Sequence, residues 1–218
     1  MIEIKELFDL SHTMASEYLA SFTYPWEALG GIENLIKRLG ESLGEEYDCP
    51  APFVWVHKTA KIAPTAYIGA PCIIGAETEV RHCAFIRGSA LVGNGCVVGN
   101  SVELKNVILF DGVQTPHYNY VGDSILGYKA HMGAGSITSN VKSDKTPVTV
   151  ACGGEKYSTG RKKVGAMLGD GVEVGCNSVL NPGTVVGRNS AIYPLSAVRG
   201  VVPPNCIYKS AQNIIRKI

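Results

Sequence analysis

The feature that most constrains the fold is a run of nine aliphatic residues placed six positions apart. They are Val56, Ile62, Ile68, Ile74, Val80, Ile86, Val92, Val98 and Leu104. Small residues come four positions after most of them, at Ala60, Ala66, Cys72, Thr78, Ala84, Ala90 and Cys96. A helix repeats about every 3.6 residues and a strand every two, so neither explains this period. A chain that turns a corner every six residues and closes a triangle every eighteen does.

The period predicts a mainly β fold, a single-stranded parallel β-helix built from hexapeptide repeats. Each hexad supplies one large inward side chain and one small one. Residues eighteen positions apart then lie directly above one another, about 4.8 Å apart, which is the spacing of neighbouring strands. The hand of the coil does not follow from the repeat, because the general rule for parallel crossovers favours right-handed turns.

We expect the β-helix to span residues 51–208, with two loops. The first is predicted at 111–121, because Leu126 lies 22 positions after Leu104, which is not a multiple of six. The second is predicted at 143–163, a polar stretch after which Leu168 and Val174 restore the six-residue step.

Both ends of the chain depart from the repeat. Residues 1–50 are predicted to be helical, with one apolar helix face formed by Ile32, Leu35, Ile36, Leu39 and Leu43. An open coil end exposes unpaired backbone, so we expect this segment to act as a cap. The last residues, 209–218, are predicted to form a short C-terminal helix after Ser210.

Composition narrows the class of partner. The chain has 218 residues, with 20 Lys and Arg against 19 Asp and Glu, so no basic field favours nucleic acid or an anionic membrane. No apolar run long enough for a membrane span or a signal peptide is expected. Seven cysteines without a CxxC pair favour a reduced, cytoplasmic protein.

Two cations are predicted to stack at one corner of successive coils. Arg87 and Lys105 are eighteen positions apart, and each follows an inward aliphatic residue. Two such charges about 5 Å apart repel by roughly 1 kcal/mol in water and about 3 kcal/mol at an intermediate dielectric. An anionic ligand between them would relieve the repulsion. The alternative is that Glu103 or a neighbouring acid neutralises them.

Two further segments carry groups suited to acyl transfer. His117 lies in the polar stretch 111–121, and imidazole is the side chain best matched to proton transfer near neutral pH. The segment GAGSITSN, residues 133–140, offers backbone amides that can hold a developing oxyanion, and it ends in Asn140. Each alone has a structural alternative, an ordinary surface histidine and a tight turn between coils.

Residues 87–140, with the motifs ELKN and HYNYVGD, resemble the acetyltransferase domain of the bifunctional glucosamine-1-phosphate acetyltransferase and N-acetylglucosamine-1-phosphate uridyltransferase. The segment KVGAMLGDGVEVGCNSVLNPGTVVG is similar to the C-terminal β-helix of sugar-phosphate nucleotidyltransferases. The resemblance covers about residues 54–205. It implies a left-handed coil, a homotrimer and acetyl-CoA or another acyl-CoA as co-substrate, with no metal.

The same resemblance implies a role for each matching residue. His117 is the expected general base, oriented in part by Glu103, and the Ala134 amide is expected to face the thioester oxyanion. Substrate contacts are expected from Arg87, Lys105, Tyr120, His131 and Asn140, and cofactor contacts from Cys176 and Lys209. The implied activity is N-acyl transfer to an amino-sugar phosphate or a sugar nucleotide.

Two departures from the family leave alternatives open. His131 replaces an asparagine that contacts the sugar, and the 143–163 loop is longer than the family's. A non-catalytic sugar-nucleotide-binding or scaffold protein is therefore one alternative. A zinc lyase of the carbonic-anhydrase type is another, but the spacing of His82, His117 and His131 does not match its pattern.

Overall fold

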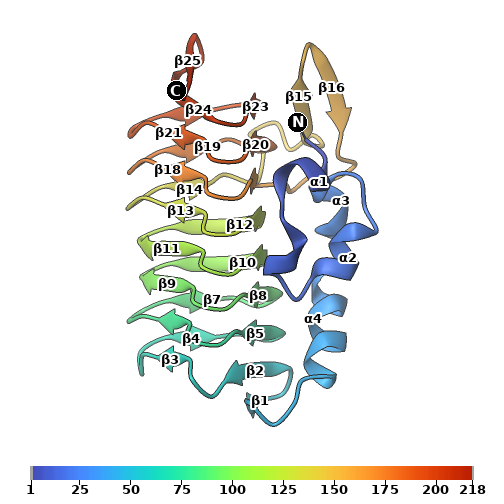
Figure 1. Cartoon of the computed structure of the whole chain (residues 1–218), viewed down its shortest axis with the longest axis vertical. Helices are drawn as coiled ribbons and strands as arrows, with labels where there is room; N and C mark the ends of the chain where they lie inside the picture. The colour runs from blue at the N-terminus through green and yellow to red at the C-terminus, as the bar shows by residue number, and fades with distance from the viewer. Residues whose placement is uncertain (1, 218) are drawn as a thin grey trace.

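The computed structural model describes residues 2–217, and the chain forms one long stack of short strands with helices along one side (Figure 1). The coils run in order from β1 (Tyr47–Ala51) at one end to β25 (Asn213–Arg216) at the other. Nearly all strand pairs are parallel, as the repeat predicts, so the mainly β helical fold is confirmed. The left-handed sense of the coil stays a prediction.

Each coil contributes strands to three faces. Face 1 contains β2 (Val54–His57), β5 (Cys72–Ile74), β8 (Ala90–Val92), the ends of β10 (Glu103–Leu109) and β12 (Tyr120–Leu126), β17 (Ala166–Leu168), β20 (Thr184–Val186) and β23 (Val201–Val202). Face 2 contains β4 (Tyr67–Ile68), β7 (Phe85–Ile86), the starts of β10 and β12, β14 (Ile137–Thr138), β19 (Val179–Leu180) and β22 (Ala197–Val198). Face 3 contains β3 (Lys61–Ile62), β6 (Glu79–Val80), β9 (Val97–Asn100), β11 (Gln114–His117), β13 (His131–Met132), β18 (Glu173–Val174), β21 (Ala191–Ile192) and β24 (Cys206–Ser210).

The loop predicted at 111–121 is wrong, because this stretch stays in the coil. Strand β11 pairs in parallel with both β9 and β13. The six-residue count fails there because two successive coils have seventeen residues, as the pairs Leu104–Val121 and Leu109–Leu126 show. Each of these two coils is one residue shorter than eighteen, and the shortening lies at the corner between faces 2 and 1. There β10 and β12 continue around the bend as seven-residue strands.

One long segment leaves the coil. His131 pairs with Glu173, 42 positions later, where an ordinary coil needs eighteen. The chain departs after Asn140 and returns at Val164, whose amide donates to the Asn140 carbonyl at 3.0 Å. Between them β15 (Thr149–Cys152) and β16 (Glu155–Ser158) form an antiparallel hairpin that projects beside the C-terminal coils (Figure 1). We call residues 141–163 the insert.

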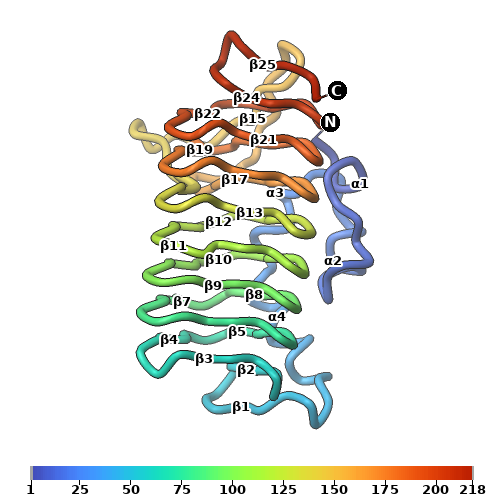
Figure 2. The backbone as a smooth tube through the Cα atoms, turned by 60° about the vertical axis from the view of Figure 1, so that its left-hand side comes forward, coloured from blue at the N-terminus to red at the C-terminus, as the bar shows by residue number. Residues whose placement is uncertain are grey.

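The N-terminal segment is helical, but it covers a side of the coil instead of an end. Its helices are α1 (Ile4–Leu7), η1 (Leu10–His12), α2 (Ser16–Ala20), α3 (Pro25–Ala28) and α4 (Ile32–Glu41). Helix α4 packs on β5, β8 and β10 of face 1, and Figures 1 and 2 show the helices beside that face. The predicted cap over the coil end is therefore corrected.

The apolar outer surface of face 1 explains this placement. Its outward column is Ile73, Leu91, Ile108, Ile125, Met167 and Val185, and each is at most 1% exposed. Strands of face 1 are thus apolar on both sides, and they need a second layer. The predicted helix face supplies it, since Ile32, Leu35 and Ile36 of α4 are buried.

Both ends of the coil are bordered by antiparallel strands. Strand β1 pairs with β2, and β25 pairs with β24. The helix predicted at 209–218 is therefore wrong for the described residues, since Asn213–Arg216 is a strand; Ile218, like Met1, lies outside the described part of the chain. The β-branched pair Ile214 and Ile215 suits a strand, and pairing satisfies the edge of β24.

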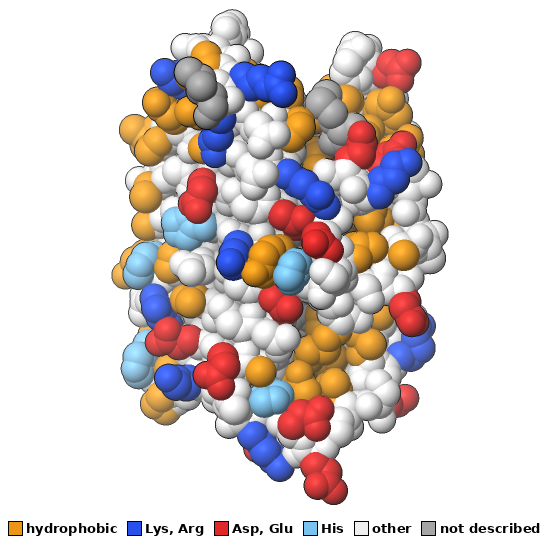
Figure 3. All heavy atoms as spheres, in the orientation of Figure 1, with side chains coloured by type: hydrophobic (Ala, Val, Ile, Leu, Met, Phe, Trp, Pro, Cys, Tyr) orange, Lys and Arg blue, Asp and Glu red, His pale blue; other side chains and the backbone are white. Residues whose placement is uncertain are grey.

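The surface carries mixed charge. Figure 3 shows Lys, Arg, Asp and Glu side chains interspersed over one side of the molecule, in keeping with the formal net charge of +1. No helix within residues 2–217 is both long and apolar enough to cross a membrane.

Replacing Ile108 by Ala should lower the free energy of unfolding by about 2–5 kcal/mol, because this side chain is 0% exposed beneath the helices and its loss leaves a cavity. The matched control is Ile215→Ala on β25, where the side chain is 41% exposed and the loss should be small. Urea denaturation measures both. Equal losses would show that the helices do not shield face 1.

Candidate active site

Arg87 and Lys105 stack at the corner between faces 2 and 1, which we call corner B. Strands β7 and β10 align Ile86 with Leu104. The next residue in each strand is a cation, so Arg87 and Lys105 lie one above the other on successive coils. The spacing of eighteen predicted this arrangement. On the following coil, the residue in line with Arg87 and Lys105 is Gly122, which pairs with Lys105.

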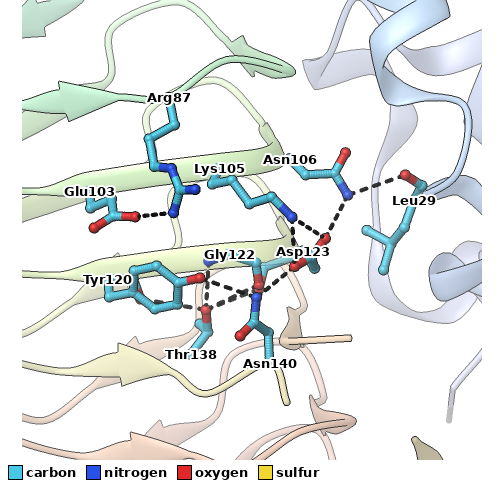
Figure 4. A network of polar contacts seen from close by, with 11 residues as sticks. Leu29, Arg87, Glu103, Lys105, Asn106, Tyr120, Gly122, Asp123, Thr138 and Asn140 are labelled. Atoms are coloured by element: carbon cyan, nitrogen blue, oxygen red, sulfur yellow. Dashed lines mark hydrogen bonds and ion pairs between the residues drawn. The ribbon is translucent and has the colours of Figure 1, made fainter. Parts of the chain in front are cut away.

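Each of the two cations has an acidic partner in the structure. Arg87 donates from Nη1 to Oε1 of Glu103 at 2.9 Å, and this hydrogen bond is the main reason that the pKa of Arg87 is raised (Figure 4). The two side chains are 48% and 33% exposed. An ion pair this accessible contributes little to stability, about 0–1 kcal/mol.

The partner of Lys105 is Asp123, which is not among the site residues predicted from the sequence. Its carboxylate is buried and accepts from Lys105 Nζ at 3.3 Å, from Asn106 Nδ2 at 2.9 Å and from Asn140 Nδ2 at 2.6 Å (Figure 4). Asn106 also donates to the Leu29 carbonyl at 3.2 Å, which joins the network to the N-terminal helices. The available signal was a spacing of seventeen from Asn106 to Asp123 and from Asp123 to Asn140.

Tyr120 and Asn140 complete this network. The Tyr120 hydroxyl accepts from Asn140 Nδ2 at 3.1 Å, so its own proton is available to a ligand. Burial first, and then the charge of Asp123, raises the pKa of Tyr120, which keeps the phenol protonated. A Cβ at Gly122 would meet the Tyr120 hydroxyl and Asn140 Nδ2, so a larger residue here would displace these two side chains from their hydrogen bond.

The expected general base lies at the corner between faces 3 and 2, which we call corner A. The His117 carbonyl accepts from the Gly135 amide at 3.0 Å, and the Ala134 carbonyl accepts from the Asn177 amide at 2.8 Å. These bonds place His117, Ala134 and Cys176 in one column on three successive coils. Three of the predicted catalytic and cofactor residues therefore share one edge of the molecule, whereas Glu103 lies on face 2.

The upper part of corner A carries a cation. Tyr193 pairs with the backbone of Tyr208 in the next coil, and Lys209 Nζ lies 5.3 Å from the centroid of the Tyr193 ring. Lys209 is three coils beyond Ala134, a distance of about 14 Å at the usual strand spacing. A ligand that begins at Ala134 and ends at Lys209 would run along this edge.

Corners A and B border the same face. Glu103 and Tyr120 occupy its outward column, between His117 on one side and Lys105 on the other. His117 is exposed, and the Glu103 carboxylate contacts Arg87; no hydrogen bond joins it to His117 in the described structure. Face 2 thus presents an accessible imidazole at one edge and a cation pair at the other.

His131 lies on a different face from the cation pair. It is on β13 of face 3, and its Nδ1 is 2.8 Å from Oε2 of Glu173. Both residues line a pocket of about 590 Å³. The three histidines of the zinc alternative do not lie together. His82 and His117 are at corner A with one coil between them, and His131 is on face 3. Within residues 2–217 no group of three side chains is placed to hold a metal ion.

Replacing Asp123 by Asn should lower the free energy of unfolding by about 1.5–3 kcal/mol, the usual value for a hydrogen bond to a charged group. Asn adopts the positive φ of 49° that the backbone has here, so the change tests charge and not geometry. Asp144→Asn in the exposed insert is the control. Equal urea midpoints for the two variants would contradict the stabilising role of the Asp123 network.

Comparison with known proteins places the chain in a family. The model of the GMPPB C-terminal domain matches residues 71–190. The bifunctional sugar-1-phosphate nucleotidylyltransferase/acetyltransferase of Sulfurisphaera tokodaii is 32% identical over 78% of this chain and 39% of its own length. The bifunctional protein GlmU of Methanococcus vannielii is 30% identical over 86% of this chain and 42% of its own length. The chain thus spans about two fifths of these relatives.

Among solved structures, a hexapeptide transferase family protein from Anaplasma phagocytophilum is 18% identical, with a TM-score of 0.42 over 75% of this chain and 78% of that one. The family match covers more than half of the chain, and its limits fall inside the β-helix. The chain belongs to the family of the GMPPB C-terminal domain.

Proposed function

We propose that the protein is an acyl-CoA-dependent N-acyltransferase, with acetyl-CoA as the donor and an amino-sugar phosphate or sugar nucleotide as the acceptor. The observation that carries the proposal is the column of corner A. It aligns an exposed imidazole, a backbone amide and Cys176 on three successive coils, and the cation pair lies across the same face. The name of the Sulfurisphaera tokodaii relative, which includes acetyltransferase and sugar-1-phosphate nucleotidylyltransferase activities, supports the same reaction.

The proposed chemistry is a single acyl transfer. The His117 imidazole takes a proton from the neutral amine of the sugar as the amine nitrogen forms a bond to the thioester carbonyl carbon. The Ala134 amide stabilises the oxyanion that develops. When the carbon–sulfur bond breaks, the proton on the imidazole passes to the leaving thiolate, and the products are an amide and free coenzyme A.

The two ion pairs at corner B differ in how readily an acceptor phosphate would open them. The Arg87–Glu103 pair is largely exposed, so a phosphate can replace the Glu103 carboxylate at little cost. The Asp123 carboxylate is 3% exposed and has three donors, so it should keep its place. Arg87 is therefore the expected first contact of the phosphate, and Lys105 would approach it from the Asp123 side.

Replacing His117 by Ala should lower kcat by roughly 10²–10⁴-fold and leave KM for the acceptor nearly unchanged, because general-base assistance acts in the transition state. Thiol release from acetyl-CoA, measured with glucosamine 1-phosphate and related amino-sugar phosphates, follows the reaction. The matched control is His82→Ala, at the same corner two coils away. An unchanged kcat for the His117 variant would refute its role as the base.

The same assay separates the proposal from a non-catalytic sugar-nucleotide-binding protein. That alternative predicts ligand binding by the wild-type chain with no thiol release from any acceptor. It would also leave ligand affinity independent of His117.

We further propose that the active protein is a homotrimer. His117, Cys176 and the neighbouring Leu195 are exposed at corner A, Leu195 by 79%, whereas acyl transfer benefits from a site that excludes water. Helices cover face 1, so faces 2 and 3 remain available for packing. A neighbouring chain whose face 3 lies against face 2 would bring its own His131 toward the cation pair.

Replacing Phe85 by Glu should convert the trimer to monomers. Phe85 is 44% exposed on face 2, and its ring lies 5.5 Å from that of Tyr67, so the two form an accessible apolar patch. Ile214→Glu on β25, where the side chain is 38% exposed, is the control. Sedimentation velocity gives the mass, and a wild-type monomer or a Phe85→Glu trimer would contradict the proposal.

A further inference from the structure

A pocket at corner B is not explained by the residues assigned so far. Its volume is about 500 Å³, and three parts of the chain form it: the N-terminal helices, three successive coils and the base of the insert. The coils contribute Lys105 and Asp123, so the pocket is continuous with the candidate active site. The insert contributes Arg161, Lys162 and Lys163.

The pocket carries an excess of positive charge. Its lining includes four cationic side chains and two carboxylates, Asp123 and Glu33. Glu33 already binds Lys37 at 2.6 Å outside the lining, and Asp123 binds Lys105. The three cations of the insert therefore have no acidic counterpart in the pocket, and a pocket with an excess of positive charge favours a bound anion.

Arg161 is held in place without a partner for its charge. Its carbonyl accepts from the Val148 amide at 2.8 Å, and its own amide donates to Thr159 Oγ1 at 3.2 Å, so the backbone is fixed. The Nε atom is buried with no hydrogen-bond acceptor, and no ion pair to the guanidinium exists among residues 2–217. The charge of the Arg161 side chain is therefore not compensated within the described residues.

Gly30 allows this guanidinium to sit against the helices. A Cβ at position 30 would lie 2.8 Å from Arg161 Nη1, so any larger residue would displace the side chain. The bridge between Val141 and Lys163 closes the base of the insert next to the exposed side chains of Lys162 and Lys163. A planar guanidinium beside two ammonium groups suits phosphate oxygens, which arginine binds with paired hydrogen bonds.

We infer that this pocket binds the second phosphoryl group of a nucleoside diphosphate-linked sugar, so that the acceptor is an amino-sugar nucleotide. The inference rests on the proposed function, because it places the sugar-linked phosphate at Arg87 and Lys105 and the next phosphate at Arg161. Coenzyme A carries phosphates too. However, its proposed path follows corner A to Lys209, across face 2 from this pocket.

Calorimetry with the full chain tests the inference, with UDP and GDP as probes and coenzyme A in a parallel arm. Arg161→Ala and the double variant Lys162→Ala/Lys163→Ala should each weaken nucleoside diphosphate binding by roughly 10- to 100-fold, as expected for lost charge-assisted hydrogen bonds. Coenzyme A binding should not change. The matched control is Lys156→Ala, which removes the same charge from the hairpin strand β16 and should leave both affinities unchanged.

Two results would overturn the inference: wild-type affinity for both nucleotides in the Arg161 variant, or a loss confined to coenzyme A, which would assign the pocket to the donor.

The proposed function can fail independently of this inference. Nucleotide binding that depends on Arg161, without acyl transfer to any acceptor, supports the pocket and refutes the reaction. Transfer to glucosamine 1-phosphate with an unchanged KM in the Arg161 variant, and no nucleotide binding, refutes the pocket and leaves the reaction standing.

Discussion

The backbone hydrogen bonds between successive coils are the constraint on which the rest of the structure depends. Within the stack, strands pair in parallel with strands of the neighbouring coils, so each coil has to return to the same register. A coil can lose or gain residues only at a corner or in a segment that leaves the stack. The seventeen-residue coils and the insert show the two solutions, and both occur at the corner between faces 2 and 1.

This explains how far the sequence could predict the fold. The period fixed the architecture and the stacking of Arg87 on Lys105, because both follow from counting within unbroken hexads. The count between Leu104 and Leu126 contains two shortened coils, and a deletion at a bend cannot be told from a projecting loop by spacing alone. The mistake at the N-terminal end concerned long-range packing, since covering face 1 depends on residues far along the chain. The mistake at the C-terminal end concerned a local hairpin, in which β25 pairs with the preceding strand β24.

The candidate site divides between two corners of face 2. The sequence predicted the residues of corner A more completely than those of corner B. His117 was selected from its place in the sequence, and Ala134 and Cys176 through resemblance. The backbone bonds of corner A align all three, although the insert separates the last two. Asp123 and Arg161 were not selected as site residues. Their importance depends on the groups that face them in the fold. A single sequence does not show that three donors converge on Asp123, or that Arg161 Nε has no acceptor.

The buried carboxylate of Asp123 has a physical reason to be an aspartate. Every side chain that faces it is a donor: the Lys105 ammonium and the amides of Asn106 and Asn140. A carboxylate offers acceptors only, whereas an asparagine would turn an NH₂ group toward one of those donors. Because Asn106 also reaches the Leu29 carbonyl and Asn140 is the last residue before the insert, this one side chain connects the helices, the coils and the insert. The geometry of corner B therefore depends on a residue that need not contact a ligand.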